Sequence, residues 1–147
     1  MKKRQSTKSD AVKQYGEVFT PTKLVNEMLD KLPPELFCDS TKTYLDHSCG
    51  DGQFLIEVLR RKMRTGIDCL TALRTIYGVE LQQKWADQCR ARLFANAYKW
   101  SLGHHRVPPI KEMMGILQYN IRCADALNEK HPGWLLTGYM WAKGPKC

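Results

Sequence analysis

Three acidic residues stand where short apolar stretches end, and their side chains are suited to holding a ligand. Asp46, Glu80 and Asp125 each close a stretch with the length and composition of a buried strand. When strands are parallel, their carboxyl ends meet at one edge of the sheet, where ligands bind. We therefore expect the three carboxylates to lie together. Such a group suits a ligand with a positive centre, ribose hydroxyls and an exocyclic amine.

A glycine-rich turn follows the first of these acids. Residues 46–52 read Asp-His-Ser-Cys-Gly-Asp-Gly, and residues 53–63 then have the apolar spacing of a helix. Gly50 and Gly52 can adopt positive φ angles and let a ligand approach the backbone. The start of the helix offers unpaired N–H groups and a positive dipole end to an anion. We interpret this segment as a ligand cradle, the alternative being a tight turn that binds nothing.

The rest of the chain alternates between helix and strand patterns. Helices are expected at about 21–32, 53–63, 68–74, 81–99 and 109–117, and strands at about 43–46, 76–80, 120–125 and 135–141. Thr20 is expected to cap the first helix. A stripe of apolar residues four apart is expected to face the core, and it consists of Leu81, Trp85, Cys89, Leu93 and Ala97. The alternation predicts an α/β fold with a mainly parallel sheet of three to four strands, flanked by helices.

Length and charge limit the organisation and the partners. The 147 residues suffice for one core, so we expect a flexible basic tail at 1–10 and a single domain at 11–147. Lys and Arg number 23 against 15 Asp and Glu, and the formal charge of +8 favours nucleic acid as a partner over a merely soluble basic protein. The run His104-His105-Arg106 is interpreted as a basic loop, because a metal site would need further ligands at a suitable spacing.

The six cysteines do not form a metal-binding or disulfide pattern. None belongs to a C-x-x-C pair, so zinc has no support from spacing and no metal is expected. Several fall on apolar faces, and the N-terminus has no apolar signal segment, so we expect reduced thiols in a cytoplasm. No apolar run is long enough to span a membrane.

Four segments occur in an order that resembles a known family. These are residues 16–21 (Gly-Glu-Val-Phe-Thr-Pro), 46–54, 77–81 (Tyr-Gly-Val-Glu-Leu) and 123–127 (Cys-Ala-Asp-Ala-Leu). Together they resemble the N-terminal half of an adenine-N6-specific DNA methyltransferase of the restriction-modification type. The resemblance implies a Rossmann-like methyltransferase fold, truncated, and a bacterial or phage-infected cell as its location. It also implies S-adenosyl-L-methionine as the cofactor.

In that family the segment before the first strand closes over the methionine end of the cofactor. The acid of the first motif faces the methionine amino group, that of the second holds the ribose, and that of the third accepts from the adenine amine. The resemblance thus assigns these roles to Asp46, Glu80 and Asp125. The implied cofactor-binding residues are Phe19, Thr20, Asp46, Ser48, Cys49, Gly50, Gly52, Phe54, Glu80, Leu81, Asp125 and Ala126.

The chain departs from the family in two ways. His47 stands where proline is common, and Asp51 stands where a small hydroxyl residue is usual. More importantly, the family carries an Asn/Asp/Ser-Pro-Pro-aromatic run after the third motif, where a flipped adenine donates its amine and stacks on the ring. The Pro-Pro pairs at 33–34 and 108–109 both precede the third motif and lack those flanking residues. No catalytic residue is therefore assigned.

Three interpretations of function remain. The first is a cofactor-binding module that is inactive alone and acts as a DNA-binding or anti-restriction protein or modulates a methyltransferase. The second is an active methyltransferase subunit completed in trans by a partner chain or by self-association. The third, a nicotinamide- or flavin-binding protein, is the weakest, because Leu55 replaces the third small residue of the dinucleotide fingerprint.

Overall fold

The computed structural model describes residues 19–106 and 109–127, and the tail predicted at 1–10 and the strand predicted at 135–141 lie outside them. The elements in chain order are α2 (Thr22–Leu29), α3 (Glu35–Cys38), β1 (Tyr44–Asp46), α4 (Gln53–Arg64), α5 (Cys69–Arg74), β2 (Ile76–Glu80), α6 (Gln83–Gly103), α7 (Ile110–Asn120) and β3 (Ile121–Cys123). The predicted α/β class is confirmed. The division into a tail and one domain at 11–147 stays a prediction.

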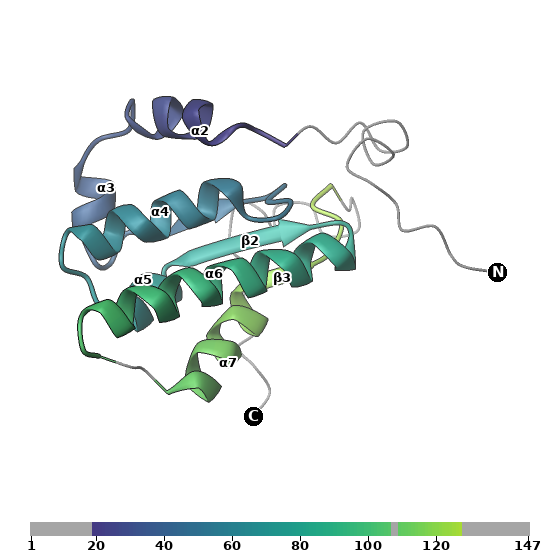
Figure 1. Ribbon diagram of the computed structural model, residues 1–147. Coiled ribbons are helices and arrows are strands. Elements are labelled where there is room, and N and C mark those ends of the chain that lie inside the picture. Colours follow the sequence, from purple (N-terminus) through teal and green to yellow (C-terminus); the bar gives the residue numbers. More distant parts are fainter. Residues whose placement is uncertain (1–18, 107–108, 128–147) are drawn as a thin grey trace.

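The three strands form a parallel sheet in the order β1-β2-β3, as the alternating pattern predicted. Tyr44 lies opposite Ile76, and Glu80 lies opposite Cys123. The crossover helices α4 and α6 lie side by side across one face of the sheet, with α2 next to α4 (Figure 1). Both helices begin at the edge where β1 and β2 end, so their first turns frame that edge.

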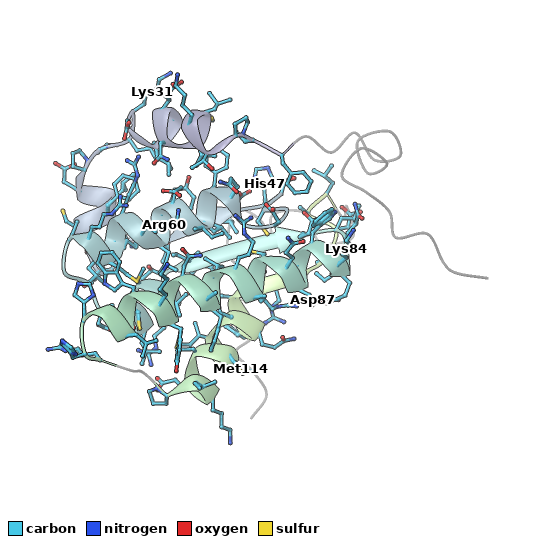
Figure 2. The ribbon with its side chains drawn as sticks, viewed as in Figure 1. Lys31, His47, Arg60, Lys84, Asp87 and Met114 are labelled. Atoms are coloured by element: carbon cyan, nitrogen blue, oxygen red, sulfur yellow. The ribbon has the colours of Figure 1, made fainter. Side chains whose placement is uncertain are left out.

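The core is built from the apolar faces that the helical spacing predicted. The crossover helices supply most of it, with Leu55, Val58, Leu59 and Met63 from α4 and Cys89, Leu93 and Ala97 from α6. Removing a valine, leucine or methionine side chain of this set from water contributes about 1.5–3 kcal/mol. On α7, Met113 and Leu117 are buried, whereas Met114 is 59% exposed and points outward in Figure 2. Packing therefore holds α4 and α6 in register with the strands that they connect.

Three details of the sequence prediction are wrong. Thr20 does not cap α2, whose N-cap is Pro21 and has no side-chain hydrogen bond. Leu81 does not belong to the core stripe but is 62% exposed, because α6 begins only at Gln83 and Leu81 lies in the turn before it. The third strand ends at Cys123 rather than at Asp125, so this acid lies two residues beyond the ladder.

Candidate functional site

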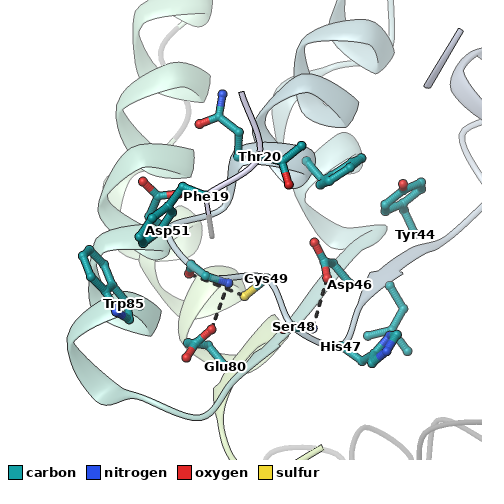
Figure 3. A pocket seen from close by; sticks show the side chains of 14 residues that line it. Phe19, Thr20, Tyr44, Asp46, His47, Ser48, Cys49, Asp51, Glu80 and Trp85 are labelled. Carbon is teal, nitrogen blue, oxygen red and sulfur yellow. Dashed lines mark hydrogen bonds between the residues drawn. The ribbon is translucent and has the colours of Figure 1, made fainter. Parts of the chain in front are cut away.

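A cavity of about 580 Å³ opens at the edge where β1 and β2 end (Figure 3). The segment before α2, the end of β1, the glycine turn, the end of β2 and the start of α6 all contribute to it. Of the predicted residues, those that line it are Phe19, Thr20, Asp46, Ser48, Cys49, Gly50, Phe54 and Glu80. Those outside its lining are Gly52, Leu81, Asp125 and Ala126. Most of the predicted residues therefore meet around one hollow.

Glu80 connects the end of β2 to the glycine turn. Its carboxylate is buried, and Oε2 accepts a hydrogen bond of 2.9 Å from the Gly50 N–H. The other oxygen, Oε1, accepts one of 2.9 Å from the Gln82 N–H. Each carboxylate oxygen has a second lone pair, so the group can accept further hydrogen bonds without releasing these. The acid is thus held in place by backbone donors and keeps acceptor capacity.

Asp46 lies half-buried at the end of β1, beside the same cavity. Its Oδ1 accepts a hydrogen bond of 3.0 Å from the Ser48 N–H. Burial raises the pKa of this carboxyl group above its ordinary value, and the negative charge of Glu80 adds to the effect, while the Ser48 hydrogen bond and His47 oppose it. A cationic group placed in the cavity would offset the cost of ionising Asp46.

The glycine turn is held by its own backbone and by close packing underneath. Cys49 donates its N–H to the Val79 carbonyl at 2.9 Å, and Gly52 donates to the Cys49 carbonyl at 2.8 Å. Gly52 is the N-cap of α4 with φ 88°, a conformation that favours glycine. A Cβ at Gly52 would lie 2.7 Å from Cys89 Sγ. Gly52 therefore shapes the turn from below, which explains why it is absent from the cavity lining.

The two thiols under the turn lie against each other. A hydrogen bond between the Cys49 and Cys89 side chains, together with burial, raises the pKa of Cys49. Both side chains are buried in the core. A thiol held protonated in this way is a poor nucleophile, so Cys49 serves packing rather than chemistry.

Arg92 of α6 attaches the turn to two helices. Its Nη1 lies 2.7 Å from Asp51 Oδ2 and donates to the Asp51 carbonyl at 3.0 Å. Its Nη2 donates to Gln53 Oε1 at 3.0 Å, and Gln53 Nε2 donates to Thr22 Oγ1 at 2.6 Å. Asp51, which stands where the family resembled by the motifs usually has a small hydroxyl residue, is therefore paired with a cation from α6. Through Gln53 the same contacts reach α2, which follows the segment with Phe19 and Thr20 that lines the cavity.

Two aromatic rings form one side of the cavity. Phe19 and Trp85 meet edge to face, with ring centroids 4.8 Å apart at 68°, and both line the hollow (Figure 3). Lys84 Nζ lies 4.4 Å from the Trp85 ring. Sequence reasoning had placed Trp85 only in the core. Its position in the first turn of the helix after β2 was the signal that it also reaches the site.

Other lining residues were not assigned to the site from sequence, namely Tyr44, Leu45, His47, Asp51 and Gln53. In the opposite sense, Asp125 is exposed, and its Oδ1 accepts from the Leu127 N–H at 2.9 Å. The segment before it is attached to β2, because the Ala124 N–H donates to the Glu80 carbonyl at 2.9 Å. Asp125 thus lies at the same edge of the sheet, but its side chain is hydrogen-bonded within its own loop and does not line the cavity.

Neither a metal site nor a membrane helix is found in the part of the chain that the structure describes. In residues 19–106 and 109–127, no three His, Cys, Asp or Glu side chains are grouped so that they could hold a metal ion. Within the same residues, no helix combines the length and the apolar character that a bilayer crossing requires.

Comparison with known proteins agrees with the resemblance drawn from the motifs. Residues 5–100 match the family model of the N-6 DNA methylases, and this match covers more than half of the chain. The chain therefore belongs to the N-6 DNA methylase family. It is 26% identical over 133 residues to the Type II methyltransferase M.VspI of Vibrio sp. (strain 343), an alignment that covers 87% of this chain and 26% of the relative. The chain thus spans about a quarter of that relative's length. No solved structure matches it significantly.

Proposed function

We propose that this chain binds S-adenosyl-L-methionine in the cavity at the carboxyl edge of the sheet, as the cofactor-binding part of an adenine-N6 DNA methyltransferase. One observation carries the proposal. Asp46 at the end of β1, Gly50 in the glycine turn and Glu80 at the end of β2 all line one cavity, and the Gly50 N–H is hydrogen-bonded to Glu80. The cavity lies where the two parallel strands end. Membership in the N-6 DNA methylase family supports the choice of cofactor.

The residues present fit this cofactor. The half-buried Asp46, whose pKa burial raises, is suited to receive the methionine ammonium group. Glu80 can accept from ribose hydroxyls through the lone pairs that its backbone donors leave. The rings of Phe19 and Trp85 exclude water from one side. When bound, the cofactor supplies an activated methyl group, and these residues hold and orient it.

Catalysis by the 147 residues alone is not part of the proposal. No Asn/Asp/Ser-Pro-Pro-aromatic run occurs among them, so nothing in the sequence matches the group that receives a flipped adenine. We expect no methyl transfer to DNA from the chain alone. Transfer that appears only when a second chain is added would establish completion in trans.

Calorimetry with S-adenosyl-L-methionine tests the binding proposal. Glu80→Ala should weaken binding by about 1.5–3 kcal/mol, because a charge-assisted hydrogen bond is lost. Asp125→Ala should do the same if the exposed carboxylate turns toward the adenine amine when the cofactor is present. Glu112→Ala, an exposed acid on α7, is the matched control and should leave the affinity unchanged. Wild-type affinity in both test variants, with the fold intact, would refute the assignment, and so would tighter binding of a nicotinamide or flavin.

The charge of the chain and the edge of its sheet bear on the partners of this module. The formal charge of +8 supports weak, salt-sensitive binding to DNA, because phosphate contacts release counterions. In addition, β1 pairs with β2 on one side, and among the described residues no strand pairs with its other side. An open strand edge accepts another strand. We favour the strand predicted at 135–141 as the one that fills it, with a partner chain or a second copy as the alternative. We place the protein in the cytoplasm of a bacterial or phage-infected cell.

A further inference from the structure

A second cavity, of about 840 Å³, lies at the opposite end of the sheet from the first. It is formed where α4 and α6 end and where α5 begins, at the left of Figure 1, whereas β2 points to the right. Arg64, Trp100, His104 and Arg106 line it, together with Asp68. The cofactor proposal uses none of these residues.

The two arginines of this cavity differ from all other described arginines. The others each have a side-chain partner: Arg60 with Glu57, Arg61 with Asp30, Arg74 with Glu112, Arg90 with Asp87, Arg92 with Asp51, and Arg122 with the Tyr119 carbonyl and ring. Within residues 19–106 and 109–127, neither Arg64 nor Arg106 makes an ion pair or a side-chain hydrogen bond. Both of these uncompensated guanidinium groups thus line the same hollow.

Arg106 is attached to the end of α6 by its backbone. Its N–H donates to the Ser101 carbonyl at 3.0 Å, and the His105 N–H donates to the Leu102 carbonyl at 3.2 Å. His105 has φ 55°, so the helix ends in a Schellman motif with a left-handed residue. This motif sets the point from which the Arg106 side chain leaves the chain, beside the cavity rather than along a free loop.

The remaining lining residues leave the cavity positive and give it a flat aromatic side. The Trp100 and His104 rings stack with centroids 4.7 Å apart at 18°, and His104 Nδ1 lies 2.8 Å from the Trp100 carbonyl oxygen. Asp68 is the one carboxylate among the described lining residues, and its Oδ1 accepts from the Thr71 N–H at 3.0 Å as the cap of α5. Its single negative charge is smaller than the combined charge of the two guanidinium groups, so the lining keeps a net positive charge.

Helix ends alone do not account for this arrangement. The carboxyl end of a helix favours a nearby cation through its dipole, and both arginines stand at such ends. That effect explains one cation at each helix end, but not the convergence of both on one cavity that also carries stacked rings. Guanidinium groups bind phosphate through paired N–H donors, and aromatic side chains stack on bases.

From this convergence we infer that the second cavity binds a phosphate group carried beside an aromatic base, with Arg64 and Arg106 on the phosphate and the Trp100–His104 pair on the base. A mononucleotide and a single nucleic-acid strand both present this chemistry. The site lies away from the proposed cofactor cavity, so both can be filled together.

Calorimetric titration of the full chain with thymidine 5′-monophosphate, thymidine and a short oligothymidylate tests the inference. Thymine probes are chosen because they do not mimic an adenosyl cofactor. Arg64→Gln/Arg106→Gln should weaken binding of the phosphorylated probes at least about tenfold, through loss of charge-assisted donors. The control Lys99→Gln/Lys111→Gln removes the same charge from exposed sites on α6 and α7 outside the cavity and should have little effect.

The outcomes separate the alternatives. Tighter binding of the monophosphate than of thymidine, lost in the arginine variant, supports the inference with a mononucleotide as ligand. Arginine-dependent binding of the oligothymidylate alone supports it with a nucleic-acid strand as the source. The inference is overturned if neither the monophosphate nor the oligothymidylate binds, or if the arginine and lysine double variants lose affinity equally. It is also overturned if the arginine variant loses thermal stability but keeps its affinity for the phosphorylated probes. None of these results depends on whether S-adenosyl-L-methionine binds.

Discussion

Replacing Gly52 by alanine is expected to destabilise the protein more than the same replacement at Gly66. Both glycines have left-handed backbone, with φ 88° and 96°, and a Cβ in that conformation costs roughly 1–2 kcal/mol. Their surroundings differ. A Cβ at Gly52 would lie 2.7 Å from Cys89 Sγ, whereas a Cβ at Gly66 would have no described neighbour within 4 Å. The comparison therefore isolates the packing under the glycine turn.

The magnitude follows from the burial of Cys89. Its side chain is completely buried on α6, so the sulfur cannot move into solvent to make room. Forcing an extra carbon into a packed site costs about 1–3 kcal/mol. Together with the backbone effect, Gly52→Ala should lower the free energy of unfolding by about 2–5 kcal/mol, against about 1–2 kcal/mol for Gly66→Ala.

Urea denaturation followed by circular dichroism measures these differences. Adding Cys89→Ala to Gly52→Ala removes the sulfur, and the double variant should be more stable than the sum of the two single losses predicts. Cofactor affinity should fall more in Gly52→Ala than in Gly66→Ala, because only the first displaces the turn. Equal losses of stability at the two glycines, or strict additivity with Cys89→Ala, would refute the reasoning.

Two further substitutions test how the site is built. Because the pKa of Asp46 is raised in the folded chain, the stability of the protein should fall as the pH rises from 3.8, the ordinary pKa of the carboxyl group, through the folded pKa. Asp46→Asn should remove that loss, so the variant should melt higher than wild type at neutral pH but not below pH 3.8, and it should bind the cofactor more weakly. An unchanged melting temperature at neutral pH would contradict this prediction. A double-mutant cycle with Arg92→Met and Asp51→Asn should give a coupling free energy of about 0.5–3 kcal/mol. This coupling should be larger than that of the matched cycle at the exposed pair Arg74–Glu112. Equal coupling energies would show that Arg92 does not stabilise the turn.

The elements that position the site follow from local sequence. Apolar spacing predicted α4 and α6 and most of their buried faces, because residues three or four apart in the chain lie on the same side of a helix. The turn at Gly50 and Gly52 could also be predicted, since positive φ angles favour glycine. The acids at the ends of β1 and β2 followed from the rule that parallel strands end at one edge. Each of these conclusions depends on residues close together in the chain.

Tertiary structure decided which of those residues meet, and it explains where the prediction from local sequence was wrong. Glu80 accepts from Gly50 across 30 positions, and Arg92 reaches the Asp51 carbonyl across 41, so neither contact has a sequence signal of its own. Leu81 matches the apolar period but lies exposed, because the helix begins two residues later. Pairings between distant segments depend on how helices and strands pack together. The sequence therefore determined the kinds of residues at the site, and the packing determined their partners and their exposure.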